Sequence, residues 1–491
     1  MDGFDEAAGA DRKASGARKE RQGAVLVEGP VPRCRRRRGA VMPPTEERDP
    51  GAHQGRAGGE QLVEVDLAGV LAAAESASPV ESLDVVARML RDRLNAAVVS
   101  FLIVDFTGSS VVRLGAADSV ESDEPPERVA LPGTLYADAL RTQRPALQRE
   151  GNSRVRVVAP VTNRGDAIGL LELFLPDHPD DFAMRQIGAT AHALAYIVIA
   201  NRSFTDVYQW GRRTRPLNLA AEIQHRLLPT SLACEAAQFT VAGALEPATH
   251  VGGDTFDYVV DRDTMQLSVT DAMGHDVEAA LLATLAVGAL RRARRAGAEL
   301  EVQALEANRA VIDHGRRGFV TGQLLRISLL DGTTQFVNAG HPWPLRLRRE
   351  RVEQMVPEVD LPFGIQPRTA YRVQRLDLQP GDRLVMLTDG MLERRAVEVD
   401  LPSLVVRTGD LHPREASRAL VAEILRAHGG RLQDDATVMC LDWHGTHQVT
   451  RSADAGADLA EASAPEQHSF DDRGPSIPTG TLGSGRGRRR G

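Results

Sequence analysis

The chain has 491 residues, enough for two or three domains, with 42% hydrophobic and 26% charged residues, as in ordinary globular proteins. The net charge of -8 gives no general reason to expect nucleic-acid binding. No run of about 18 apolar residues predicts a membrane span, and the charged start is not typical of a secretory signal. The three cysteines, Cys34, Cys234 and Cys440, lack zinc-site spacing. We therefore expect a cytoplasmic protein.

Both ends of the chain have the composition of disordered tails. Residues 1–58 are rich in Gly, Ala, Arg and Glu and show no periodicity. Their basic run at 35–38 is compatible with contacts to nucleic acid or acidic lipid, but a solvated tail is favoured. Met42 is an alternative start of the chain. Residues 446–491 turn polar, then acidic, then Gly/Arg-rich, which also indicates disorder.

Residues 60–205 carry the pattern of a small α/β module. Apolar residues at helical spacing from Leu83 to Leu94 predict an amphipathic helix, and the apolar run 97–104 predicts a strand. Two apolar runs around the turn at 163–166 predict a hairpin, and a closing helix is expected at about 182–200.

The order of these elements, with Ile-Gly-Leu-Leu-Glu-Leu at 168–173, resembles a GAF domain. GAF domains are sensory modules that often bind small ligands. No set of residues here names a ligand, and a structural or dimerising role fits the same pattern.

A helical linker is predicted at 206–232. Leu219, Ile223 and Leu227 recur at helical spacing, and Pro229 ends the helix. Together with the preceding closing helix, this segment would form a connector able to pair with its twin in a homodimer. An ordinary packed helix explains the pattern equally well.

Residues 235–445 alternate strand and helix patterns, which is typical of an α+β layered sandwich. The predicted elements are strands at 265–270, 384–387 and 437–441 and helices at 277–292 and 416–425. Asp331-Gly332 lies between two alternating apolar runs and predicts a hairpin.

Acidic residues stand at strand ends in this second domain. Asp271 and Asp389 each end a buried strand, Asp254 follows two glycines, and Asp434 and Asp435 precede the last strand. Acids on one rim of a sheet converge and raise each other's pKa by repulsion. A divalent cation removes that repulsion, and an all-oxygen site favours Mg²⁺ or Mn²⁺ over zinc.

Two such ions would activate water for hydrolysis of a phosphate ester. A single acid before glycine is more often part of a turn, as we expect for Asp331. Four acidic positions in similar settings favour a metal centre over four separate turns.

The motifs around these acids resemble those of PPM-type (type 2C-like) serine/threonine phosphatases. They are Val251-Gly-Gly-Asp254, Asp271-Ala-Met-Gly-His275, Asn338-Ala-Gly-His-Pro342, Thr388-Asp-Gly-Met-Leu-Glu393 and Asp434-Asp-Ala-Thr-Val438. More narrowly, they are similar to the bacterial branch that includes the sporulation stage II E and stress-response sigma-regulating phosphatases. The stretch 219–229 resembles the connector of that branch, so the resemblance spans about 215–445.

This resemblance implies an αββα sandwich with two Mn²⁺ or Mg²⁺ ions. Asp271 would bridge the ions, and the Ala272 carbonyl would be a further ligand. Asp389 and Asp434 would complete the shell of one ion, and Asp254 would serve the second ion or its surroundings. Asp254, Asp271 and Asp389 would form the catalytic core. Asp434 matches the family's ligand better than Asp435, but the choice stays open at this point.

The chain departs from the family pattern at several positions. Ala272 replaces the usual glycine, which a backbone ligand tolerates if φ is negative. Asp276 stands where glycine is common, and an acid there would favour the positive end of the next helix. Thr255 replaces the usual aromatic residue after Asp254, with Phe256 beside it.

The proton donor to the leaving group is not defined by these motifs. Eukaryotic members have a histidine in the stretch that matches 272–274, where this chain has Met273. His275 and His250 are candidates, although a structural role explains each of them better. We expect His341 to fix a turn near the site.

The predicted function is that of a cytoplasmic, metal-dependent protein phosphatase that acts on Ser or Thr of a partner. The resemblance implies that the partner is often an anti-sigma-factor antagonist. The GAF-like domain would bind a signal and control the metal site through the connector. One alternative is a catalytically weak or inactive phosphatase fold that acts by binding its partner, which the retained acids oppose. Another is a protein whose main role is ligand sensing.

Overall fold

The computed structural model describes most of the chain beyond its N-terminal segment. The described residues are 66–114, 127–151, 154–212, 217–248, 252–392, 399–447 and 450–465. The predicted N-terminal tail, with Cys34, the basic run and Met42, lies outside these residues, as does His250.

Residues 66–212 contain a six-stranded antiparallel sheet with the order β3-β2-β1-β6-β5-β4. The strands are β1 (Val98–Val104), β2 (Ser110–Leu114), β3 (Arg128–Ala130), β4 (Ala146–Glu150), β5 (Arg154–Asn163) and β6 (Asp166–Leu175). The predicted hairpin is β5–β6, which is paired from Val155–Leu175 down to Asn163–Asp166. Its two turn residues, Arg164 and Gly165, have φ of 48° and 74°, as a tight hairpin requires.

Helices cover both faces of this sheet. The apolar side chains of β1 point alternately toward one face and the other, and both faces need to be covered. Phe101 and Ile103 pack with the helices α1 (Leu67–Ser76), α2 (Ser82–Leu94) and α4 (Asp181–Asn201). Leu102 and Val104 pack on the other face with α3 (Leu135–Thr142). Apart from Ser100, the strand is therefore apolar on both faces rather than alternating with polar residues.

Among the described helices, only α4 is long and apolar enough to cross a membrane, and 56% of its most apolar window is buried inside the protein. A core helix passes the same test of length and composition.

Two short helices follow, α5 (Val207–Gly211) and α6 (Leu219–Leu227), and α6 is the predicted connector helix. The Asn218 side chain caps α6 by accepting a hydrogen bond of 2.8 Å from the Ala221 backbone. Ala220 and Ala221 of α6 pack closely on Ala280 of the next helix. Small side chains at this contact let the two helices approach closely.

The second half of the chain contains two antiparallel sheets, with the orders β15-β12-β11-β10-β9 and β14-β13-β16-β17-β8-β7. Strands of the first are β9 (Thr255–Val260), β10 (Thr264–Ala272), β11 (Val320–Ser328), β12 (Thr334–Ala339) and β15 (Gln374–Leu376). Strands of the second are β7 (Ala233–Glu235), β8 (Phe239–Glu246), β13 (Leu345–Arg348), β14 (Arg351–Gln354), β16 (Asp382–Leu387) and β17 (Ala436–Trp443).

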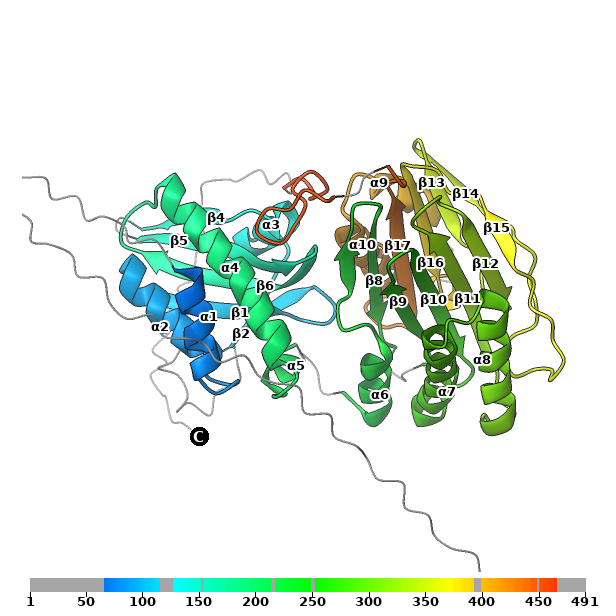
Figure 1. The fold of residues 1–491 in the computed structure, drawn as a ribbon. Helices are drawn as coiled ribbons and strands as arrows, with labels where there is room; N and C mark the ends of the chain where they lie inside the picture. The colour runs from blue at the N-terminus through cyan, green and yellow to red at the C-terminus, as the bar shows by residue number, and fades with distance from the viewer. Residues whose placement is uncertain are drawn as a thin grey trace, which may run out of the picture. The chain divides into compact units, whose positions relative to one another are not determined.

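These sheets stack face to face, with helices on both outer sides (Figure 1). Phe256 and Leu267 of the first sheet share an apolar core with Met386 and Leu441 of the second. Helices α7 (Asp276–Arg295) and α8 (Leu300–His314) cover the first sheet, and α9 (Leu401–Arg407) and α10 (Pro413–Ala427) cover the second. The predicted α+β, αββα sandwich is confirmed.

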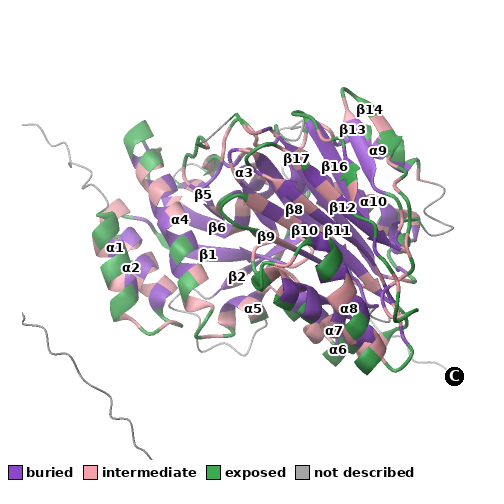
Figure 2. Ribbon diagram, turned by 45° about the vertical axis from the view of Figure 1, so that its right-hand side comes forward, coloured by how far each residue is buried: buried purple, intermediate pink, exposed green. Residues whose placement is uncertain are grey.

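Strand β17 illustrates how burial on both faces selects an apolar sequence. Met439 and Leu441 point between the sheets, whereas Val438 and Cys440 point toward α9 and α10. Figure 2 shows the same division, with buried strands inside and exposed outer helix faces.

The hairpin predicted at Asp331-Gly332 is confirmed as β11–β12, and within its turn Gly332 donates to the Ser328 carbonyl at 2.9 Å. One detail differs from the expectations. Residues 450–465 fall in the segment expected to be disordered, yet the structure gives them defined contacts. Arg451 pairs with buried Glu235 at 2.5 Å, and the His412 backbone donates to Ser463 at 2.9 Å.

Candidate metal centre

Asp271 lies at the end of β10, beside Thr321 of β11. Its carboxyl group is partly buried. Burial raises its pKa to about 7, and repulsion from Asp389, Asp434 and Asp435 adds to the rise. The structure therefore brings together acids from three separate motifs, as the strand-end positions predicted.

Asp254 lies deeper, with only 2% of its surface exposed. Burial raises its pKa well above the ordinary value, and the charges of Asp271 and Asp435 raise it further. The Thr388 hydroxyl donates a hydrogen bond of 2.6 Å to its carboxylate and opposes that shift. Thr388 precedes Asp389, so this bond joins two of the acidic motifs.

Asp389 begins a short 3₁₀ helix, η1 (Asp389–Leu392), directly after β16. Its side chain reaches the surface. Partial burial raises its pKa, and the charge of Asp434 adds a smaller rise. The next residue must be glycine, because a Cβ at Gly390 would lie 2.0 Å from the Asp435 carbonyl oxygen. This close approach sets Asp389 beside the Asp434–Asp435 pair.

Asp434 and Asp435 have different surroundings. Asp435 is 1% exposed and accepts hydrogen bonds from the Ala248 backbone, at 2.8 Å, and from the Gln224 side chain. Asp434 is partly exposed and accepts from the Asp435 backbone at 2.8 Å. Gly252 packs against both, since a Cβ there would lie 2.8 Å from Asp434 Oδ1. Two protein donors thus hold the buried Asp435 carboxylate, whereas Asp434 stays in partial contact with solvent.

The backbone around Asp271 accounts for one of the departures from the family pattern and leaves another unexplained. Ala272 is not among the residues with positive φ, so its Cβ is tolerated, and its N–H donates to the Gly253 carbonyl at 3.3 Å. Asp276 has a φ of 60°, the left-handed region that favours glycine. Its side chain lies 2.9 Å from His275 Nδ1.

The two described histidines near these motifs differ in exposure. His275 is exposed at the start of α7. His341 is buried, which lowers its pKa to about 3 and keeps it neutral. The Asn338 side chain bonds to both the N–H and the carbonyl of His341, at 2.8 and 3.0 Å. The expected turn at His341 is therefore confirmed.

Two residues with clear contacts at this centre had no role in the sequence interpretation. Gln224 donates to the Asp435 carboxylate and, at 2.9 Å, to the Asp254 carbonyl. Thr388 holds Asp254. A signal for Gln224 was present, because it is a polar residue on the same helix as the apolar stripe of Ile223 and Leu227.

The donors at this centre suit a hard divalent cation. In the described part of the chain, no three His, Cys, Asp or Glu side chains already have the arrangement of metal ligands. The side chains that converge are nevertheless all carboxylates, and repulsion raises the pKa of Asp254 and Asp271. A bound cation would relieve that repulsion, so the residues fit Mg²⁺ or Mn²⁺.

Residues 261–444 match the model of the family Stage II sporulation protein E (SpoIIE). This SpoIIE-type segment contains Asp271, Asp389, Asp434 and Asp435 and begins after Asp254.

The relatives agree with this match. The chain is 22% identical over 232 residues to phosphoserine phosphatase RsbU of Bacillus subtilis (strain 168), covering 46% of this chain and 69% of RsbU. It is 24% identical over 206 residues to stage II sporulation protein E of Priestia megaterium, covering 40% of this chain and 35% of that protein. Family model and relatives together support a SpoIIE/RsbU-type phosphatase domain.

Among solved structures, one similar chain is the PP2C phosphatase domain with a fragment of the regulatory domain of SpoIIE from Bacillus subtilis. The sequence identity is 22%, the TM-score is 0.37, and the match covers 42% of this chain and 64% of that chain.

Proposed function

We propose that this protein is a metal-dependent protein-serine/threonine phosphatase. The observation that carries the proposal is the convergence of Asp254, Asp271, Asp389 and Asp434 in and beside the SpoIIE-type segment. Burial and neighbouring charges raise the pKa of Asp254, Asp271 and Asp389, so these carboxylates are costly to keep together unless a cation joins them. This arrangement favours an active enzyme over a phosphatase fold that only binds its partner.

Asp271, Asp389 and Asp434, with the Ala272 carbonyl, would hold two Mn²⁺ or Mg²⁺ ions, and Asp254 would serve the second of them. Such ions supply a water nucleophile at neutral pH and neutralise phosphoryl oxygens. Thr388 orients the Asp254 carboxylate through its hydrogen bond. Asp435 would position the connector rather than bind an ion.

Control of the phosphatase would come from the GAF-like domain through α6. Gln224 of α6 donates to Asp435 and to the Asp254 backbone, so a shift of α6 changes the support of two acids. The same helix packs on α7, which follows Asp271 in the chain. A ligand of the GAF-like domain, or pairing of two connectors in a homodimer, would act along this route.

The substrate would be a phosphorylated regulatory protein in the cytoplasm. RsbU, a similar protein, is named a phosphoserine phosphatase. The substrate class that we propose is an anti-sigma-factor antagonist phosphorylated on Ser or Thr, as the resemblance of the motifs implies.

Hydrolysis of p-nitrophenyl phosphate by the full chain, with and without Mn²⁺, tests the enzyme. We expect a Mn²⁺-dependent rate that falls by more than about 100-fold in Asp389→Asn, because even loss of an outer partner of a metal ligand costs about 10–100-fold. Asp331→Asn is the matched control, since Asp331 lies in an exposed turn. A rate that is independent of Mn²⁺, or equal in the two variants, would overturn the proposal.

A further inference from the structure

A second candidate site lies in a cavity of about 140 Å³, formed where three segments of the chain meet. The segments are the β1–β2 turn with β3, the connector at Arg212, Leu217 and His225, and helix α10 with the end of β8. None of the acids of the metal centre lines this cavity. It therefore offers a binding site separate from the phosphatase centre.

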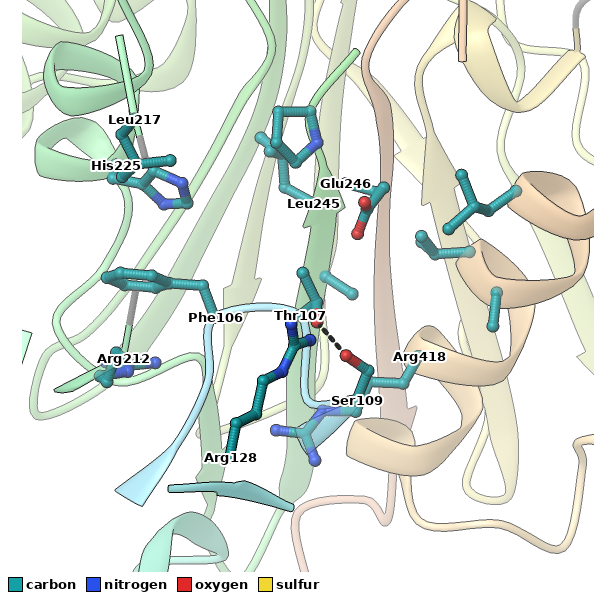
Figure 3. Close-up of a pocket in the computed structure, with 15 residues that line it drawn as sticks. Phe106, Thr107, Ser109, Arg128, Arg212, Leu217, His225, Leu245, Glu246 and Arg418 are labelled. Carbon is teal, nitrogen blue, oxygen red and sulfur yellow. Dashed lines mark hydrogen bonds between the residues drawn. The ribbon is translucent and has the colours of Figure 1, made fainter. Parts of the chain in front are cut away.

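Three arginines line the cavity. Figure 3 shows Arg128 and Arg418 approaching the Thr107–Ser109 turn from different elements. Arg212 lies with its guanidinium carbon 4.4 Å from the centre of the Phe106 ring. Arg128 stands at the exposed mouth, and its Nε donates to Ser110 Oγ at 2.9 Å.

The glycine of the β1–β2 turn leaves room for Arg418. A Cβ at Gly108 would lie 2.1 Å from Arg418 Nε, and Gly108 has a φ of 68°. The turn thus admits a guanidinium group from a helix about 310 residues further along the chain. The Arg418 side chain is therefore fixed in the cavity wall by close packing against Gly108.

The arginines of the cavity have acidic neighbours, and Arg128 Nη2 lies 3.8 Å from the Asp105 carboxylate. Burial lowers the pKa of Arg212 and of Arg418. The charges of Arg202 and Arg418 lower the pKa of Arg212 further. The charge of Arg414 does the same for Arg418. Asp166, Asp105 and Glu415 oppose these effects from behind the wall. Among the described lining residues Glu246 alone is acidic.

The acids behind the wall are themselves engaged. The Asp105 carboxylate accepts from the Ser109 backbone at 2.9 Å and from the Ser110 hydroxyl at 2.8 Å. An anion that enters the cavity would therefore add hydrogen-bond acceptors for guanidinium groups that have lost part of their water.

The remaining wall is hydroxyl and apolar. Thr107 Oγ1 and Ser109 Oγ lie 2.7 Å apart beside the arginines (Figure 3). The Phe106 ring lies 4.3 Å from the His225 ring, measured between centroids, and Val421 and Leu425 extend the apolar side. These groups suit a ligand that joins an anionic head to a small apolar body.

We propose that this cavity binds a small organic phosphate or phosphonate. Three guanidinium groups present more N–H donors than the two oxygens of a carboxylate use, whereas the three terminal oxygens of a phosphoryl group match them. The head lies against the arginines, and the apolar body lies against Val421 and Leu425, because His225 and Arg212 already stack on the Phe106 ring.

Binding here also reaches the connector. His225 lines the cavity, and its neighbour Gln224 donates to Asp435. A ligand that orders this part of α6 would stabilise one position of Gln224. Any effect on catalysis rests on the proposed phosphatase function, but binding itself does not.

Phenylphosphonate is the probe, because its carbon–phosphorus bond is not a phosphate ester that the proposed enzyme could hydrolyse. It is titrated calorimetrically into the full chain with EDTA present, so that metal at the phosphatase centre does not contribute. We expect saturable binding, at least tenfold weaker in Arg418→Gln and unchanged in Arg426→Gln. Arg426 is the matched control, since it is exposed on the same helix.

Milder variants separate ligand contacts from folding. Glu246→Gln should strengthen binding by removing the acidic lining residue. Asp389→Asn should bind like the wild type, and benzyl alcohol, which lacks the anionic head, should not bind. The proposal is overturned if the wild type shows no saturable binding, if benzyl alcohol binds as well, if Asp389→Asn abolishes binding, or if neither Arg418→Gln nor Glu246→Gln changes it.

Discussion

Gln224 of the connector helix donates a hydrogen bond to the buried carboxylate of Asp435, 211 residues away in the chain. The same amide group donates to the Asp254 carbonyl. The Gln224 side chain therefore joins the connector helix to two acidic motifs of the metal centre, those of Asp254 and Asp435. Asp435 lies next to Asp434, so the contact is one residue from a proposed metal ligand.

Replacing Gln224 by alanine should reduce both stability and activity. The Asp435 carboxylate would lose a donor while buried, which costs about 1–3 kcal/mol of unfolding free energy. Urea unfolding and Mn²⁺-dependent hydrolysis measure the two effects. Arg226→Ala is the control, because Arg226 is exposed on the same helix. Equal behaviour of the two variants would show that the Gln224 contact has no role.

The two neighbouring acids should respond differently to the same substitution. Asp434→Asn should raise the Mn²⁺ concentration that gives half of the maximal rate by more than about tenfold. The melting temperature should change little. Asp435→Asn should lower the melting temperature, because its carboxylate accepts from Ala248 and Gln224 inside the protein. A Mn²⁺ titration of the rate and a thermal melt distinguish them. The reverse pattern would assign the ligand role to Asp435.

The metal-free protein should become more stable as the pH falls from 8 to 6. The pKa of Asp271 is about 7 in the folded chain and near 3.8 when unperturbed, so its charge destabilises the folded state above pH 7. Protonation removes this penalty, and the gain over this interval is at most about 1.4 kcal/mol.

Urea unfolding in EDTA at both pH values measures this gain, with Asp271→Asn as the comparison. The variant should lose the Asp271 part of the pH dependence and be more stable than the wild type at pH 8. An identical pH dependence in both proteins would refute the assigned role of Asp271.

Two glycine-to-alanine substitutions should have opposite effects on stability. Gly390→Ala places a Cβ against the Asp435 carbonyl and should cost about 1–3 kcal/mol or more, together with activity. Gly288→Ala lies in α7 with open space around its Cβ, and should stabilise by about 0.5–1 kcal/mol. Thermal melts of both variants check the pair. A stable, active Gly390→Ala protein would mean that this approach of the backbones is not needed.

Much of the architecture followed from local pattern. The helical stripe of Leu219, Ile223 and Leu227 predicted α6, and the apolar run before Asp271 predicted β10, because side-chain periodicity reports which face is buried. Acids at strand ends predicted a common rim of one sheet, and here the structure differs. Asp254 and Asp271 lie at β9 and β10 of the first sheet, whereas Asp389 and Asp434 lie at β16 and β17 of the second. The structure brings Asp254, Asp271, Asp389 and Asp434 into mutual electrostatic range.

Tertiary structure decided what pattern could not. Asp434 and Asp435 are adjacent and identical in residue type. Only the hydrogen bonds from Ala248 and Gln224 distinguish the buried Asp435 from the partly exposed Asp434. The cavity beside Arg418 and the contacts of residues 450–465 likewise depend on segments far apart in the chain. Periodicity describes which face of an element is buried, but not which distant group it meets, because that depends on how the layers stack.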